Sequence, residues 1–297
     1  MIKKNVKKSV VAIILSACVV ATGFYGCTSS NNQDDSSSNQ AVSGSITVIS
    51  REDGSGTRDA FTELIGVVDE QGNDATTQTA EITNSTSVMM STVSGNKRAI
   101  GYVSLGSLSD EVKAVSVDGV PASAETVKDG SYKLQRPFKV AYIDDSLSEI
   151  ARDFLAFVVS AEGEAIIEEE GYISTETQEH YTPSDISGTV TIAGSTSVAP
   201  VMNVLADKYK QLNPSAKVEI QESGSSAGIE SAVQGAVDIA MSSRELEEDE
   251  LEVLTDMTIA IDGIAVIVNK ENTVDNISTE QIRSIFAGDT VKWEEVE

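Results

Sequence analysis

The sequence contains a single histidine, His180, and two cysteines, Cys18 and Cys27. A Ser-His-Asp triad or a Cys-His pair needs a histidine beside the nucleophile, and a histidine-based metal cluster needs several. His180 lies in a polar stretch, so the sequence favours none of these sites. Both cysteines precede residue 28, so we expect neither an intramolecular disulfide nor thiolate chemistry in the rest of the chain.

Positive charge is also scarce. The sequence contains 21 Lys and Arg but 47 Asp and Glu, which gives a net charge of −26. Four of the lysines lie within the first eight residues, and without that segment the net charge is −30. So acidic a surface argues against nucleic acid or an anionic membrane surface as a partner. Any bound anion must therefore be held by local donors and not attracted by the overall charge.

The N-terminal segment has the pattern of a secretory signal. Its lysines precede the apolar residues 10–24, a run shorter than a comfortable membrane span. The polar tract 28–40 cannot bury a core and reads as a flexible tether. The alternative is an uncleaved anchor helix.

A signal, a cysteine and a polar tether in this order resemble a bacterial lipoprotein. Cys27 is the expected lipidation site, because the tether begins directly after it. Cys18 is the alternative, since the residues before it match the usual lipobox better. We therefore expect a signal peptide over 1–26 and a tether over 27–43.

Four short runs of Ser, Thr and Gly carry the strongest functional signal, and each reads as the opening of a helix. They are residues 51–58, 194–197, 224–228 and 242–244. A helix N-terminus offers unpaired N–H groups and partial positive charge, hydroxyls add donors, and glycine admits close approach. The alternative is that each run only caps its own helix, and Ser242 with Glu245 fits a capping box. Because four runs recur and two contain arginine, they predict one metal-free site for a small oxyanion.

Strands and helices alternate along the chain, which predicts an α/β architecture with largely parallel sheets. Ligands then bind at the carboxyl ends of the strands, where all four runs fall. Residues 174–187, with Pro183 and no periodicity, predict a linker. The expected strands are 45–49, 99–103, 137–142, 189–193, 217–220, 237–241 and 258–268, and the expected helices begin near 57, 146, 198, 225 and 278.

Several segments resemble signatures of the phosphate-binding proteins of ABC transporters. Residues 48–61 resemble the second-lobe signature of that family. The resemblance covers nearly everything from about residue 44 to residue 297. Segments 193–200, 224–228 and 240–244 resemble the first-lobe signature, and 99–103 and 264–269 also match the family.

The order of the segments departs from the family pattern, in which the counterpart of 194–197 comes near the N-terminus. Here the region like the family's C-terminal half, 44–173, precedes the region like its N-terminal half, 188–297. One explanation is a circular permutation in which the linker joins the former termini. The other is a broken tandem that keeps parts of two copies. In the family pattern, the segment that ends at residue 297 would continue into the segment that begins at residue 44, with neither overlap nor obvious gap. This continuity favours one complete binding unit and leaves its origin open.

The resemblance implies a two-lobed periplasmic-binding-protein fold of type II, with hinge strands and a ligand cleft that closes. We expect the first lobe to combine 188–268 with 113–173. The second lobe would then combine 44–112 with 269–297.

The resemblance also implies the ligand residues. Arg51 offers a fork of donors for phosphate oxygens, and the Asp53 carboxylate can only accept a hydrogen bond, which favours protonated phosphate over sulfate. Ser243 stands where some members have aspartate, so its role as acceptor is open. Arg58 and Arg244 either contact ligand or pair with Asp53, Asp59 or Asp262. The phosphate-binding set is Thr196, Ser197, Ser225, Ser243, Arg51, Asp53, Ser55, Gly56 and Thr57.

The implied function is that of a lipid-anchored receptor on the outer face of the bacterial cytoplasmic membrane. It would capture inorganic phosphate for the permease of an ABC importer, without cofactor or metal. The alternatives are a receptor for sulfate, molybdate or tungstate, or a rearranged remnant with no transport role. An enzyme is disfavoured, because the sequence offers no metal cluster, activated nucleophile or base.

Overall fold

The computed structural model describes residues 41–175 and 179–296. The expected signal peptide, most of the tether, Cys18 and Cys27 lie outside the described residues. Within those two ranges, no helix is both long enough and apolar enough to cross a membrane.

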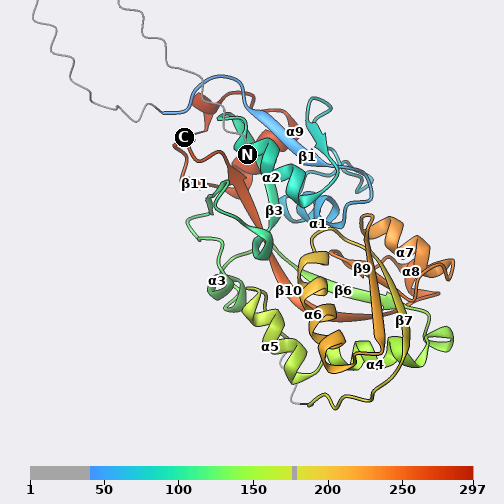
Figure 1. Cartoon of the computed structure of the whole chain (residues 1–297). Helices are drawn as coiled ribbons and strands as arrows, with labels where there is room; N and C mark the ends of the chain where they lie inside the picture. The colour runs from blue at the N-terminus through green and yellow to red at the C-terminus, as the bar shows by residue number, and fades with distance from the viewer. Residues whose placement is uncertain (1–40, 176–178, 297) are drawn as a thin grey trace, which may run out of the picture. The chain divides into compact units, whose positions relative to one another are not determined.

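One mixed sheet organises the described chain, in the strand order β2-β1-β3-β10-β6-β9-β7-β8, with β4 paired to β10 (Figure 1). The strands β2, β1 and β3 are parallel to one another, and so are β9, β7 and β8. Between these groups β10 runs antiparallel to β3 and β6, so the expectation of largely parallel sheets holds only for the two flanks. The strands are β1 Thr47–Arg51, β2 Glu81–Thr83, β3 Ala99–Ser104, β4 Lys113–Ala114, β6 Gln135–Tyr142, β7 Gly188–Gly194, β8 Ala216–Glu222, β9 Ile239–Ser242 and β10 Thr255–Val268.

The long strand β10 belongs to two hydrophobic cores. Its first part pairs with β6 as far as Gly263 opposite Gln135, and its last part pairs with β3 from Ile264 onward. One core draws its buried residues from 138–260, and another draws them from 48–134 together with 264–293. We call residues 135–262 the first lobe and residues 42–134 with 263–296 the second lobe. The junction is the boundary between them, where the pairing of β10 changes from β6 to β3.

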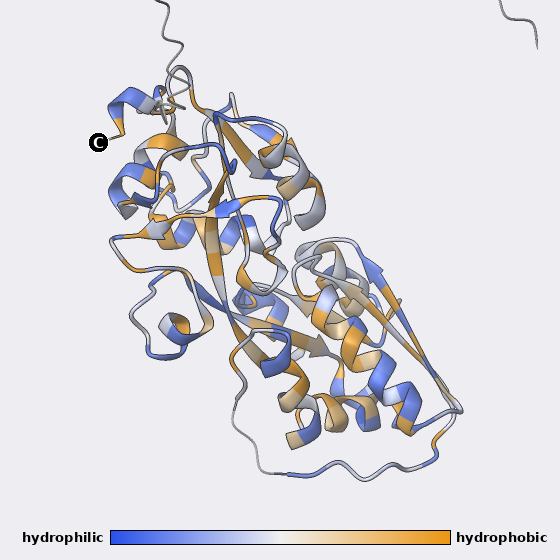
Figure 2. Ribbon diagram, turned by 60° about the vertical axis from the view of Figure 1, so that its left-hand side comes forward, coloured by the Kyte–Doolittle hydropathy of each residue, from blue (hydrophilic) through white to orange (hydrophobic). Residues whose placement is uncertain are grey.

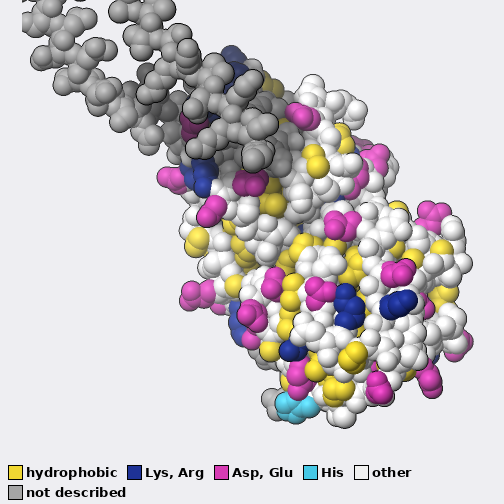
Figure 3. All heavy atoms as spheres, viewed as in Figure 1, with side chains coloured by type: hydrophobic (Ala, Val, Ile, Leu, Met, Phe, Trp, Pro, Cys, Tyr) yellow, Lys and Arg dark blue, Asp and Glu magenta, His cyan; other side chains and the backbone are white. Residues whose placement is uncertain are grey.

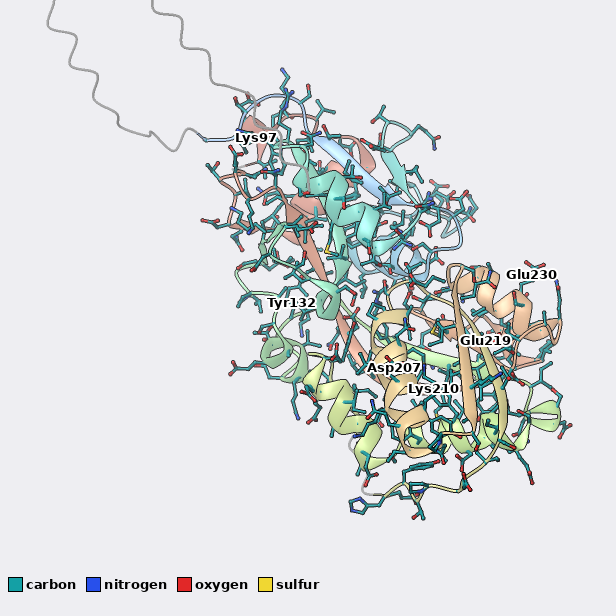
Figure 4. The ribbon with its side chains drawn as sticks, viewed as in Figure 1. Lys97, Tyr132, Asp207, Lys210, Glu219 and Glu230 are labelled. Carbon is teal, nitrogen blue, oxygen red and sulfur yellow. The ribbon has the colours of Figure 1, made fainter. Side chains whose placement is uncertain are left out.

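This division corrects the lobe boundaries expected from the sequence. The segment 113–134 and the end of β10 belong to the second lobe, because Val115, Tyr132 and Val266 are buried in its core. Two long-range bonds hold them there, since the Val115 amide donates to the Val266 carbonyl at 3.0 Å and the Tyr132 hydroxyl donates to the Ile264 carbonyl at 2.8 Å. Tyr132 is labelled beside the junction in Figure 4.

Helices cover both faces of the sheet in each lobe. In the first lobe α4 Glu149–Val158, α5 Ala161–Glu169 and α6 Ala199–Leu212 pack on one face, and α7 Ser225–Val233 packs on the other with α8 Glu248–Leu251 near it. In the second lobe α1 Gly56–Ile65 and α9 Thr279–Ala287 lie opposite α2 Thr86–Ser94. Figure 2 shows hydrophobic residues gathered along the strands and on one side of the helices. Shorter elements are α3 Ala124–Lys128, β5 Ser116–Val117 paired with β11 Asn276–Ile277, and 3-10 turns at Leu105–Ser107, Asp144–Ser146 and Trp293–Glu295.

The beginning and the end of the described chain lie side by side in the second lobe. Ser45 and Lys292 form an antiparallel bridge, and the Trp293 amide donates to the Gly44 carbonyl at 3.1 Å. The Gly44 amide donates to Glu294 Oε1 at 2.9 Å. The segment after residue 43 thus pairs directly with the last described turn.

The expected linker 174–187 has no regular structure over its described residues 174–175 and 179–187, yet it is anchored to the first lobe. The Tyr181 hydroxyl donates to Asp153 Oδ2 of α4 at 2.6 Å, and its ring meets Phe157 edge-on at 5.2 Å. Ser184 Oγ donates to Asp153 Oδ1 at 2.9 Å. The linker therefore joins α5 to β7 within one lobe.

Acidic side chains are spread over the face shown in Figure 3, with few Lys or Arg among them. The edge strand β8 carries exposed Lys217 and Glu219, which is typical of edges protected from pairing with another chain. Asp207 and Lys210 of α6, labelled in Figure 4, form an exposed ion pair of 2.7 Å.

Candidate functional site

The four Ser, Thr and Gly runs meet at the carboxyl ends of β1, β7, β8 and β9, as the sequence predicts. Three of them open helices, namely α1, α6 and α7. The run at Ser242 does not, because the Ser242 hydroxyl donates to the Arg244 carbonyl at 2.9 Å and the next helix begins at Glu248. The capping-box reading of Ser242 with Glu245 is therefore wrong.

Capping accounts for few of the hydroxyls in these runs. Ser55 caps α1, but the N-terminal caps of α6 and α7 are Val198 and Gly224, and neither uses a side chain. Ser195 Oγ accepts from the Ser197 and Val198 amides at 3.2 and 3.4 Å, whereas the hydroxyls of Thr196 and Ser197 face the second lobe. This observation favours the anion interpretation over simple capping.

Two contacts join the second-lobe loop to the loop after β7. Thr57 Oγ1 lies 2.8 Å from Ser197 Oγ, and Arg51 Nη2 donates to Thr196 Oγ1 at 3.1 Å. All four residues are at most 7% exposed. Side chains 140 and 145 residues apart in sequence therefore share one buried cluster.

Ser243 lies at the first-lobe side of this cluster. Ser195 Oγ donates to Ser243 Oγ at 2.9 Å, and Ser225 Oγ lies 3.4 Å from the same atom. The Ser243 amide donates to Ser225 Oγ at 3.2 Å. The loops after β7, β8 and β9 are thereby tied together.

Gly56 lets the second lobe approach this cluster closely. A Cβ atom there would lie 2.5 Å from Ser225 Oγ and 2.9 Å from Ser243 Oγ. Such distances are too short for a carbon contact, so only glycine fits without movement.

Arg51 is held by its neighbour Glu52. Arg51 Nε and Nη2 donate to the two Glu52 carboxylate oxygens at 2.8 and 2.7 Å, a bidentate pair. Its backbone amide donates to the hydroxyl of Tyr102, whose pKa burial raises to about 12. Tyr102 therefore stays protonated and fixes the end of β1.

Asp53 lies outside the cluster, contrary to the sequence-based expectation. Its side chain is 96% exposed and accepts from Arg58 Nη1 at 2.5 Å. The turn through Gly54, with φ of +80°, carries this carboxylate away from the buried hydroxyls. The Asp53 carboxylate therefore does not lie where it could select a protonated ligand in the cluster.

Arg58 and Arg244 form ion pairs, which was one of the two alternatives. Arg58 pairs with Asp53 and Asp74, and Arg244 pairs with Asp59 across the lobes at 3.3 Å. A hydrogen bond from Arg244 to Glu250 raises the pKa of Arg244, while burial raises the pKa of Asp59. Asp262, the third candidate partner, pairs with Arg136 instead.

Thr86 joins the cluster although the sequence analysis did not single it out. It begins α2, is 5% exposed, and its hydroxyl lies 3.3 Å from both Thr196 Oγ1 and Ser197 Oγ. The only signal was an Asn-Ser-Thr run before an apolar helix, which reads as an ordinary cap. A cavity of about 220 Å³ adjoins Thr86 and Thr196 and is also lined by Ser87, Met90, Ser107, Pro200 and Glu222.

The cluster offers hydroxyls, backbone N–H groups and one guanidinium, which suit a small oxyanion. In the described part of the chain, no group of three or more His, Cys, Asp or Glu side chains is arranged to hold a metal ion. Eight of the nine expected binding residues lie in or directly beside the cluster, and Asp53 does not.

Comparison with known proteins agrees with this geometry. The sequence model of a protein family, the PBP superfamily domain, matches residues 3–162 and 179–297 of this chain. Phosphate-binding protein PstS 2 of Streptococcus pneumoniae is 42% identical over 287 residues, covering 95% of this chain and 98% of the relative. The chain belongs to the PstS family of phosphate-binding proteins.

A second relative and a solved structure extend this result. Phosphate-binding protein PstS 2 of Streptococcus agalactiae is 44% identical over 270 residues, covering 89% of this chain and 91% of that protein. The crystal structure of a phosphate-binding protein of a phosphate ABC transporter from S. pneumoniae matches with a TM-score of 0.69 and 44% identity. It covers 86% of this chain and all of that chain, so the two-lobed fold is shared.

Proposed function

We propose that this protein is an extracytoplasmic receptor that binds inorganic phosphate between its lobes and delivers it to the permease of an ABC importer. The observation that carries the proposal is the buried cluster in which Arg51 and Thr57 of the second lobe meet Thr196 and Ser197 of the first. Its PstS relatives are named as phosphate-binding proteins. A binding role also fits a site rich in donors and poor in nucleophiles and bases.

The ligand would lie among hydroxyls and not against a carboxylate from Asp53. A serine or threonine hydroxyl both donates and accepts hydrogen bonds, so it can accept a hydrogen bond from the P–OH group of a protonated phosphate. Ser243, which stands where some relatives have aspartate, is suited to that role through its contacts with Ser195 and Ser225. The ligand set is Arg51, Ser55, Gly56, Thr57, Thr196, Ser197, Ser225 and Ser243, with Thr86 added.

Asp53→Asn is expected to leave phosphate affinity within about twofold, because Asp53 forms an exposed ion pair with Arg58. The preference for phosphate over sulfate is expected to stay the same. Calorimetric titration of both anions into the variant and the parent chain measures this. A large gain in sulfate affinity would instead place the Asp53 carboxylate against the ligand.

Thr86→Val is expected to weaken phosphate binding about fivefold, since it removes one buried hydroxyl while keeping the side-chain shape. The matched control is Thr92→Val on the same helix, which makes no contact with the cluster. Equal affinity of the two variants would remove Thr86 from the site.

We further infer that 44–173 and 188–297 are complementary halves of one binding unit, joined by the linker 174–187. Three observations support this inference: the pairing of Gly44 with Trp293, the cluster drawn from both halves, and the anchored linker.

The lipid anchor is proposed at Cys27, on the sequence pattern alone. Cys27→Ser is expected to release the protein from the membrane fraction of expressing cells into the medium, whereas Cys18→Ser leaves it bound. Immunoblots of the two fractions measure the distribution. The reverse result would assign the anchor to Cys18.

A further inference from the structure

A buried ion pair occupies the junction between the lobes. Arg136 of β6 and Asp262 of β10 are register partners and are 3% and 1% exposed. Arg136 Nε and Nη2 donate to Asp262 Oδ2 at 3.2 and 3.0 Å. Two apolar side chains of similar volume would stabilise such a position at least as well, so stability alone does not account for the pair.

The remaining hydrogen bonds of this pair reach both lobes. Ser104, the last residue of β3 in the second lobe, donates from Oγ to Asp262 Oδ1 at 2.9 Å. Arg136 Nη1 donates to the backbone carbonyl of Ser243 at 3.2 Å. One continuous series of bonds therefore runs from Ser104 through the ion pair to the anion cluster.

The Arg136 charge also lies near the site. Burial is the main cause that lowers the pKa of Arg136, and the positive charge of Arg51 adds to it. An anion bound in the cluster would reduce the repulsion between these two guanidinium groups. Phosphate binding and the arrangement at the junction are then energetically linked.

We propose that Arg136 is a positioning residue for the anion site, and that with Asp262 and Ser104 it links the junction to Ser243. The proposal rests on the proposed function. If Ser104 moved away from Asp262, or Ser243 away from Arg136, one buried charge of the pair would lose a hydrogen bond. That loss costs free energy. The network therefore favours the arrangement in which the lobes meet around the ligand.

The test replaces the pair by apolar side chains in the full chain, as Arg136→Met with Asp262→Leu. This variant is expected to melt within a few degrees of the parent, yet to bind phosphate about tenfold more weakly. The matched control is Lys139→Met with Asp256→Leu, an ion pair of 2.5 Å on the same two strands that has no bond to Ser243. The control is expected to keep the parent affinity.

A merely structural role would lower the melting temperature and leave the phosphate affinity of the folded protein unchanged, and that result would overturn the proposal. If the double variant fails to fold, Ser104→Ala decides, because it removes one bond to Asp262 and touches no cluster residue. It is expected to weaken phosphate binding about threefold, and parent affinity would again overturn the proposal. Absence of phosphate binding by the parent chain itself would instead refute the proposed function.

Discussion

Arg51→Met is expected to lower phosphate affinity at least about a hundredfold. The guanidinium is 2% exposed and, among the described residues, is the one cationic group that donates to a hydroxyl of the cluster, since Arg136 donates to the Ser243 carbonyl. Each charge-assisted hydrogen bond to an anion contributes about 1.5–3 kcal/mol, so the loss of two amounts to two or more orders of magnitude. Glu52 would also lose its bidentate partner, which adds a nearby unpaired negative charge.

Isothermal calorimetry with phosphate measures this loss. Arg152→Met is the matched control, because Arg152 is 48% exposed and pairs with Asp144 away from the cluster. The control is expected to bind as the parent does. Arg51→Met with affinity within threefold of the parent would contradict the assignment of the ligand site.

Gly56→Ala is expected to weaken phosphate binding by about 30- to 100-fold without destabilising the ligand-free protein. The added Cβ would lie 2.5 Å from Ser225 Oγ, so the lobes must stay further apart and the contacts to the ligand lengthen. Gly56 is the first residue of α1, where alanine is the better helix former, so the melting temperature is expected to stay equal or rise. Weaker phosphate binding with an equal or higher melting temperature would show that the lobes close less well around the ligand and that folding is intact.

Calorimetry together with thermal melting measures the two effects. The control is Gly95→Ala at the end of α2, where a Cβ would have no neighbour closer than 3.4 Å and φ is −80°. A Gly56→Ala variant with parent affinity would show that the ligand does not require this close approach.

Local patterns predicted most of the fold. Apolar periodicity and cap residues located the long strands and most of the longer helices, but not α2, and Ser278 with Gln281 forms the capping box of α9. Gly288 ends that helix in the left-handed conformation that glycine favours. These features depend on residues within a few positions of one another.

The lobe boundaries depend on pairings that no local pattern records. The apolar run that ends at Val268 predicted a strand but not that its two parts pair with β6 and β3 in different lobes. Position in sequence also could not show that the Asp53 side chain turns outward or that Thr86 turns inward, because both depend on packing between distant segments. The pairing of Arg136 with Asp262, 126 residues apart, belongs to the same class.

Titration of phosphate into the chain from residue 28, with sulfate as the comparison anion, tests the central claim most directly. Calorimetry gives the stoichiometry and the affinity, and sedimentation equilibrium measures whether the chain is a monomer. The account predicts one phosphate per chain, because both halves of the cluster come from the same molecule. A folded monomer that binds no phosphate, or one phosphate shared by two chains, would contradict it.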